Sequence, residues 1–219
     1  MKATTLALAG LGLFALSRVT LRSTGATRWE RTRALPGDDA VPGAGDAWTM
    51  ATTIDAPPSA VWRWLVQIGS DRAGFYSFDR LDNAGRPSVE EIRPEWQTLA
   101  LGDRLASTPS GRTWFVVSEI EPERSLVLRA SIDAKERRSY DPAEERPRFF
   151  VDSSWSFVLE PLASRTRLLV RTRSAARPAV LARLANVLFF DPAHWIMQTR
   201  QLIRIRHLAE TGELAHSTS

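Results

Sequence analysis

Residues 68–83 read IGSDRAGFYSFDRLDN, with two glycines, three aromatic residues and three aspartates in sixteen positions. The stretch follows an apolar helical pattern. Two later segments together have a similar mixture of aromatic, acidic and glycine residues, Arg93-Pro94-Glu95-Trp96-Gln97 and Leu101-Gly102-Asp103. Glycine permits backbone shapes that other residues resist. Aromatic rings with a few polar groups are typical of the wall of a small-molecule pocket. The stretch therefore indicates a ligand cavity, although it does not name the ligand.

Composition favours one globular domain with appendages. The chain has 219 residues, of which 43% are hydrophobic and 25% charged. Such a chain is long enough to bury a sizeable core. The net charge is +4, but the arginines are dispersed among acidic residues. This dispersion is typical of a solvated mixed-charge surface, and we expect no nucleic-acid partner.

The chain contains no cysteine and only three histidines, His194, His207 and His216. Disulfides, thiolate catalysis and cysteine-based metal sites are therefore excluded. So few histidines also disfavour a multi-histidine metal site. We expect neither a metal nor a cofactor.

The N-terminus raises a question of membrane attachment. Residues 3–16 are almost uncharged, Lys2 precedes them, and several arginines follow. The run is shorter than the roughly 17 to 20 apolar residues of a spanning helix. Three alternatives remain: a membrane anchor, a cleaved signal that implies secretion, and the docked helix of a soluble cytoplasmic protein. We favour an anchor over residues 1–22, with the domain on the cytoplasmic side, because downstream arginines are retained there.

The rest of the chain divides into three parts. Residues 23–46 are rich in glycine and proline and show no apolar period, which predicts a loosely packed linker. Residues 47–212 carry the periodic segments and form the predicted domain. Residues 213–219 form a predicted polar tail.

The predicted domain opens with a strand and a helix. Apolar and small polar residues alternate over 48–54, which predicts a strand with one buried face. Asp55-Ala56-Pro57-Pro58-Ser59 stops this strand and starts a helix. The helix has one apolar stripe, formed by Val61, Trp64, Leu65 and Ile68. A second short helix is expected within residues 71–83.

An antiparallel meander follows. Alternation predicts strands over about 102–107, 114–120, 126–132, 149–159 and 168–172, joined by turns. On the last strand Leu168, Val170 and Thr172 face the core, while Arg167, Arg171 and Arg173 are expected to face water. The highly charged residues 133–148 form an expected exposed, mobile excursion.

The C-terminus supplies a cover for the apolar face of the sheet. Residues 178–190 predict a short amphipathic helix. Asp191-Pro192 then predicts the start of a long helix, and Gly212 its end. Its apolar stripe consists of Trp195, Thr199, Leu202, Ile203, Ile205 and Ala209. The expected class is therefore α+β, with one antiparallel sheet and a long C-terminal helix.

This order of elements resembles the START-like helix-grip superfamily, also called SRPBCC. The match covers residues 48–210; residues 56–69 look like the first helix of that superfamily. The stretch of residues 71–83 and Arg93-Pro94-Glu95-Trp96-Gln97 resemble its bacterial polyketide-cyclase-like branch, although Arg80 stands where the branch has an aromatic residue. The resemblance implies a curved sheet wrapped around the C-terminal helix, with a cavity for a hydrophobic molecule between them. It implies no fixed catalytic motif.

Candidate site residues come from the segments expected to face that cavity. Tyr76, Asp79, Glu95 and His194 are the ionisable candidates for a general acid or base, although each has an ordinary structural alternative. Gln198 falls within the apolar stripe, so its amide needs a buried partner or a ligand. The catalytic residues stay unknown, and the predicted ligand-binding set is Tyr76, Asp79, Glu95, Trp96, Trp155, Trp195 and Gln198.

Three functions are compatible with these observations. The favoured hypothesis is noncovalent binding of a hydrophobic small molecule or lipid, for carriage or sequestration near a membrane. The first alternative is a polyketide cyclase or dehydratase-like enzyme. The second is a partner-binding module whose cavity is filled by its own side chains. The volume of the interior space separates them, because ligand pockets start at about 300 Å³.

Overall fold

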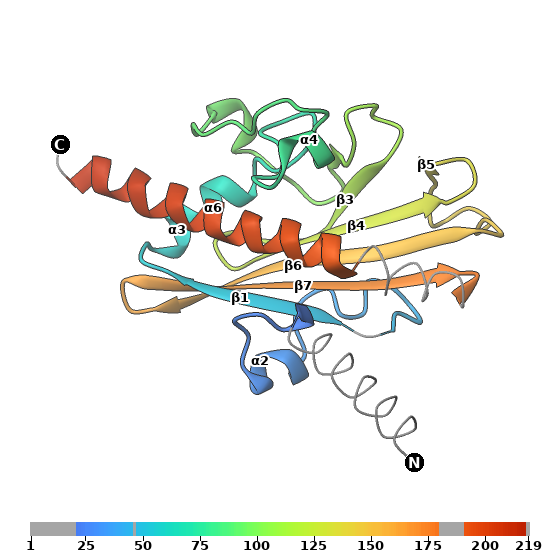
Figure 1. Ribbon diagram of the computed structural model, residues 1–219, viewed down its shortest axis with the longest axis horizontal. Helices are drawn as coiled ribbons and strands as arrows, with labels where there is room; N and C mark the ends of the chain where they lie inside the picture. The colour runs from blue at the N-terminus through green and yellow to red at the C-terminus, as the bar shows by residue number, and fades with distance from the viewer. Residues whose placement is uncertain (1–20, 46, 180–190, 218–219) are drawn as a thin grey trace, which may run out of the picture.

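The computed structural model describes residues 21–45, 47–179 and 191–217, with side chains described as far as residue 212 (Figure 1). A seven-stranded antiparallel sheet has the order β1-β7-β6-β4-β3-β2, and β5 pairs with β4. The long helix α6 (Asp191–Ser217) lies along this sheet. The predicted α+β class is confirmed, and the arrangement fits the helix-grip fold. The strands are β1 (Trp48–Ile54), β2 (Arg104–Ala106), β3 (Trp114–Glu121), β4 (Ser125–Asp133), β5 (Arg138–Ser139), β6 (Phe150–Leu162) and β7 (Arg165–Arg177).

Two short helices and a 3-10 turn lie between β1 and β2. The helix α3 (Pro58–Leu65) has proline at its start, as predicted, and buries Val61, Trp64 and Leu65. Ile68 is also fully buried, but it lies beyond the end of this helix. The expected second short helix is α4 (Asp79–Asp82), and a 3-10 turn, η1 (Pro94–Trp96), follows.

The main core lies between the inner face of the sheet, α3 and α6. Alternate strand residues such as Met50, Leu128 and Phe157 point inward and meet Leu202 and Ile205 of α6. These residues are at most 6% exposed. Strand alternation and the helical stripe both predicted this face, because each follows the period of its own backbone.

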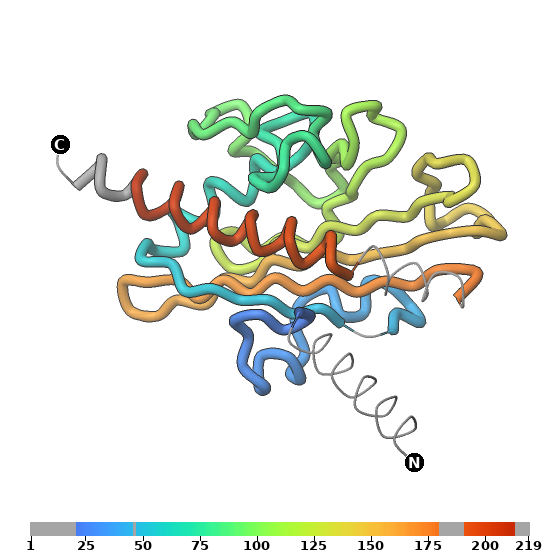
Figure 2. The backbone as a smooth tube through the Cα atoms, viewed as in Figure 1, coloured from blue at the N-terminus to red at the C-terminus, as the bar shows by residue number. Residues whose placement is uncertain are grey.

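The outer face of the sheet is covered as well, which corrects two expectations. Thr49 and Ala51 of β1 are buried, so the strand does not have a single buried face. Leu35 packs on Ala51, Val158 and Leu169, all on the outer side. The loose packing expected of residues 23–46 is therefore wrong for the described residues 21–45. Figure 2 shows this blue segment, which includes α2 (Arg28–Thr32), beside β1. Its first residues also contact α6, where Arg22 pairs with Asp191 and Thr24 accepts from Trp195.

The arginines of β7 hold that segment in place. Arg167 binds Glu30 at 2.7 Å, and Arg171 binds Asp38 at 2.7 Å and the carbonyl oxygen of Glu30 at 2.7 Å. Arg173 also donates to the backbone of Asp38. The expectation that these arginines face water is wrong, because acidic and carbonyl groups of residues 30–38 cover them.

The charged excursion of residues 133–148 is tied to the sheet. Its residues are mostly exposed, as expected, but β5 pairs with β4. Tyr140 donates to the buried carboxylate of Asp152 at 2.6 Å, and Arg146 pairs with the same carboxylate at 3.2 Å. These bonds anchor both halves of the excursion.

At the C-terminus the helix α6 continues to Ser217, so Gly212 does not end it, and residues 213–217 are helical rather than a tail. The predicted helix of residues 178–190 falls almost entirely outside the described residues, as does the apolar run of residues 3–16. Among the helices of the described part, none is both long and apolar enough to cross a membrane.

Candidate ligand pocket

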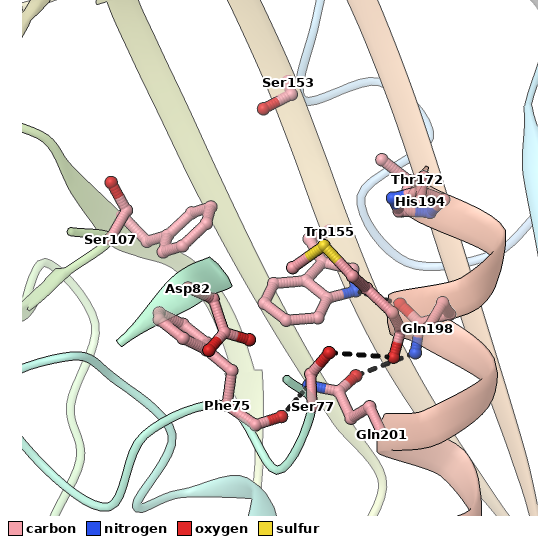
Figure 3. A pocket seen from close by; sticks show the side chains of 12 residues that line it. Phe75, Ser77, Asp82, Ser107, Ser153, Trp155, Thr172, His194, Gln198 and Gln201 are labelled. Carbon is pink, nitrogen blue, oxygen red and sulfur yellow. Dashed lines mark hydrogen bonds between the residues drawn. The ribbon is translucent and has the colours of Figure 1, made fainter. Parts of the chain in front are cut away.

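A cavity of about 290 Å³ lies between the inner face of the sheet, the stretch that leads into α4, and the first turns of α6 (Figure 3). Three aromatic rings and several polar side chains form its wall. The lining residues are Phe75, Ser77, Asp82, Ser107, Phe115, Ser153, Trp155, Thr172, His194, Met197, Gln198 and Gln201.

The glycine- and aromatic-rich stretch of residues 68–83 forms one wall of the pocket. Gly74 has a left-handed backbone (φ +82°), and a Cβ there would lie 2.8 Å from the Ser88 hydroxyl. Tyr76 also has a positive φ of 56°. This tight path directs Phe75 and Ser77 toward the pocket, while Tyr76 points into the core. The glycine is required because a side chain would collide with Ser88.

Buried polar residues hold this wall from behind. Gln67 is fully buried; its amide donates to the Tyr76 hydroxyl at 2.7 Å and accepts from the backbone of Arg93. Burial raises the pKa of Tyr76, which stays protonated at neutral pH. Asp79 accepts from the backbone and hydroxyl of Ser88 at 3.0 and 2.6 Å. Both side chains therefore stabilise the wall and do not line the pocket.

The opposite wall comes from one face of α6. His194, Met197, Gln198 and Gln201 recur every three or four residues, so they share that face. A chain of hydrogen bonds crosses the pocket floor from the sheet to the 75–77 backbone. The Trp155 indole donates to Gln198 at 3.1 Å, Gln198 donates to Gln201 at 2.7 Å, and Gln201 donates to the Phe75 carbonyl oxygen at 2.8 Å. The amide of Gln198 thus finds the buried partners that the sequence demanded.

Two ionisable side chains line the pocket, and their pKa values move in opposite directions. Desolvation lowers the pKa of His194 to about 4, partly offset by Asp191, so its imidazole is neutral at pH 7. That imidazole and the Trp48 ring pack edge to face, with centroids 5.0 Å apart. Desolvation, followed by the nearby charge of Asp79, raises the pKa of Asp82 to about 6.

The predicted ligand-binding residues divide into two groups. Trp155 and Gln198 line the pocket, as does His194 from the ionisable candidates. The others lie elsewhere. Tyr76 and Asp79 stand behind the wall, and Glu95 is exposed. Trp96 packs against the main core, where its carbonyl accepts from Arg72, and the Trp195 indole donates to Thr24 of the N-terminal segment at 2.9 Å.

Several residues that line the pocket are absent from the set predicted from the sequence. Ser153 shares the inner face of β6 with Trp155, and Gln201 follows Gln198 by one turn, so periodicity could have identified both. Asp82 lies within the opening stretch, three residues after Asp79. The local sequence does not show which of the two aspartates faces the pocket. In the structure Ser88 donates hydrogen bonds to Asp79, and Asp82 faces the pocket.

A second hollow of about 540 Å³ lies between α3 and residues 97–103. Thr98, Ala100 and Asp103 on its rim are exposed. It is an open depression rather than an enclosed site, and no buried unpaired polar atom lines it. No group of three or more metal-ligating side chains occurs in the described part of the chain.

No family model and no curated protein matches the chain. Solved structures resemble it at low identity. A protein of Mesorhizobium loti is 18% identical with a TM-score of 0.39, over 73% of this chain and 95% of that one. A protein of Chromobacterium violaceum is 15% identical with a TM-score of 0.43, over 75% and 96%. CalU16 of Micromonospora echinospora is 16% identical with a TM-score of 0.34, over 80% and 91%. These likenesses carry no statement about ligand or activity.

Proposed function

We propose that this protein binds a small, largely apolar molecule noncovalently in the pocket between α6 and the sheet. The cavity supports this proposal, because it is walled by the rings of Phe75, Phe115 and Trp155 beside a few fixed polar groups. Apolar walls with a few convergent polar groups are the usual form of a ligand site.

The volume favours a compact ligand. About 290 Å³ lies at the lower limit of pockets that hold small molecules, which run from about 300 to 1,000 Å³. A ring system of one or two rings suits this space better than a whole long-chain lipid. We further propose that the protein carries or sequesters its ligand near a membrane, and that it belongs to the polyketide-cyclase-like branch. Membrane attachment rests only on residues 1–22, of which residues 1–20 lie outside the described part of the chain.

Calorimetric titration with 2-methoxynaphthalene, a flat and apolar probe, tests the proposal. We expect saturable binding of one molecule per chain. Ser153→Phe, which fills the pocket from β6, should weaken binding at least ten-fold. The same change at Ser164, in the exposed turn between β6 and β7, is the matched control and should leave binding unchanged. Absence of binding to the wild type, or equal binding by Ser153→Phe, would contradict the proposal.

Cyclase or dehydratase-like catalysis is the second candidate. It is favoured by the presence of two ionisable groups on the pocket wall, His194 and Asp82, whose environments separate their pKa values. A carboxyl of pKa about 6 can exchange a proton near neutral pH, and the neutral imidazole, a weak base at its lowered pKa, can hydrogen-bond a substrate oxygen or hydroxyl. Incubation with poly-β-ketone thioesters, followed by mass analysis for loss of water, tests this activity. His194→Phe should abolish any turnover while 2-methoxynaphthalene still binds.

A further inference from the structure

Asp82 contributes an unsatisfied acceptor to the pocket wall. Its two carboxyl oxygens are shielded from solvent, and no well-formed hydrogen bond reaches either of them among the described residues. The Ser77 hydroxyl and the backbone N–H of Asp82 lie near enough to lower its pKa slightly, but the Ser77 hydroxyl donates to the Met197 carbonyl oxygen at 3.2 Å. A carboxylate can accept several hydrogen bonds, and its burial without them costs free energy. A ligand that supplies a donor would remove that cost.

The charges around Asp82 do not neutralise it. Asp79, on the same short helix, adds a second negative charge, and no salt bridge to Asp82 occurs within the described residues. Across the pocket, His194 of α6 is neutral at pH 7. On α6 the guanidinium of Arg200 lies over the ring of Phe78, 5.2 Å from its centroid. The local field therefore favours a donor or a cation and disfavours an anion.

Aromatic rings define the shape of the site. The centroid of Trp155 lies 5.6 Å from that of Phe115 and 6.3 Å from that of Phe75, and Phe75 and Phe115 are 6.4 Å apart. Figure 3 shows the carboxyl of Asp82 beside the Phe75 ring, with Thr172 and His194 on the far side of Trp155. Aromatic faces and edges pack best on other flat rings.

The remaining polar groups near Asp82 are already engaged. Gln198 and Gln201 belong to the hydrogen-bond chain that runs from Trp155 to Phe75. The hydroxyl of Ser107 donates to Thr113 at 2.7 Å. On the Asp82 side of the pocket the carboxylate is therefore the acceptor left open to a ligand.

From this geometry we infer that the pocket takes a flat, apolar molecule carrying one hydrogen-bond donor, a hydroxyl or amino group, which binds the carboxylate of Asp82. The inference rests on the proposed function and names the chemical class of its ligand. The ring system packs among Phe75, Phe115 and Trp155 while the donor reaches Asp82. An anionic group in the same place is rejected by the carboxylate.

Three naphthalenes of the same ring shape test this inference by calorimetry at pH 7.5. They are 2-naphthol, which has a donor, 2-methoxynaphthalene, which has none, and 2-naphthoate, which is an anion. A hydrogen bond to a charged group contributes about 1.5 to 3 kcal/mol, so 2-naphthol should bind at least ten-fold more tightly than the ether. The anion should bind most weakly.

Substitution of the carboxylate gives the second arm. Asp82→Leu should bring the affinities of 2-naphthol and the ether within about two-fold of each other, because the acceptor is gone. Asp39→Leu, the same change at an exposed aspartate, is the matched control and should keep the preference.

The outcomes separate the two proposals. If none of the three compounds binds, the proposed function fails. If all bind the wild type equally well, only the donor inference fails. Retention of the preference by Asp82→Leu would also overturn it, since another group would then be the acceptor. If Asp82→Leu does not fold, the comparison of the three compounds on the wild type still decides whether a donor on the ligand strengthens binding.

Discussion

The indole of Trp155 on β6 donates to the side-chain oxygen of Gln198 on α6 at 3.1 Å, 43 positions along the chain. This bond joins the sheet to the helix at the pocket wall and fixes the plane of the ring. Gln198 is 4% exposed, and its amide N–H in turn donates a hydrogen bond to the side-chain oxygen of Gln201. The pocket is therefore lined by a network whose members depend on one another.

Gln198→Leu should lower the free energy of unfolding by about 1 to 3 kcal/mol, because it leaves the Trp155 N–H and the Gln201 oxygen buried without partners. Urea unfolding measures the loss. The matched control is Thr199→Ala on the next residue, whose buried hydroxyl has no hydrogen-bond partner in the part of the chain that the structure describes. Its removal should be neutral or stabilising. Equal effects of the two variants would contradict the network.

Gly37→Ala should detach the N-terminal segment from the sheet. Gly37 has φ +81°, and a Cβ there would lie 2.5 Å from both the Ser156 hydroxyl and a Val127 methyl. Gly43→Ala is the control, with φ +75° and no atom within 4 Å. Both variants carry the left-handed strain of about 1 kcal/mol. Only Gly37→Ala adds overpacking, of about 1 to 3 kcal/mol. Limited proteolysis of residues 21–45 should accelerate in that variant alone.

Glu30→Gln should destabilise the protein by about 1 to 3 kcal/mol at pH 7, because the partly buried guanidinium of Arg167 loses its buried ionic partner. The hydrogen bond from Arg167 holds the pKa of Glu30 at about 2, below its usual 4.5. The pair therefore stabilises the fold fully above pH 4.5, and this contribution is lost as the pH falls toward 2. The stability difference between wild type and variant should shrink over that window.

Glu121→Gln is the control for this prediction. Its partner Arg124 is 3.5 Å away, and both side chains are more than half exposed. Such a surface pair contributes less than about 1 kcal/mol. A constant gap between wild type and Glu30→Gln from pH 5 to pH 2.5 would show that the ion pair is not its source.

Asp82→Asn should stabilise the protein at pH 7.5. The folded-state pKa of Asp82, about 6, lies above its ordinary value of 3.8, so the fold favours the protonated acid. Its stabilising contribution is complete below pH 3.8 and is lost as the pH rises through 6. The amide cannot ionise, which gives a gain of about 1 to 3 kcal/mol at pH 7.5.

Thermal unfolding between pH 4 and pH 8 measures this gain, which should vanish near pH 4. Asp39→Asn, at an exposed position, should change stability by less than about 0.5 kcal/mol throughout. A loss of stability in Asp82→Asn at pH 7.5 would mean that the protein itself satisfies the carboxylate.

Affinity for 2-naphthol should rise about five- to ten-fold from pH 5 to pH 7.5, because an ionised carboxylate accepts a stronger hydrogen bond than its acid. Of the ionisable groups that face Asp82, Asp79 has its oxygen bonded to Ser88, and His194 is neutral throughout this range. Binding of 2-methoxynaphthalene should not change with pH. Parallel pH profiles for both compounds would exclude Asp82 as the acceptor.

The sequence by itself determined the elements and the inner face of the fold. Alternation along β1 and β6 and the stripe of Leu202 and Ile205 on α6 follow backbone periods that any local reading detects. The same periods identified Trp155 and Gln198 as pocket residues.

Tertiary structure alone decided what covers the outer face of the sheet and which carboxylate in the pocket stays available to a ligand. Residues 21–45 show no apolar period, so the sequence does not reveal that they pack on the sheet. Ion pairs with Arg167 and Arg171 hold them there, and these pairs join positions more than 130 residues apart. Likewise, Ser88 engages Asp79 and leaves Asp82 facing the rings of the pocket. Periodicity records which side of an element is buried. Which charge meets which partner is set only when distant segments come into contact.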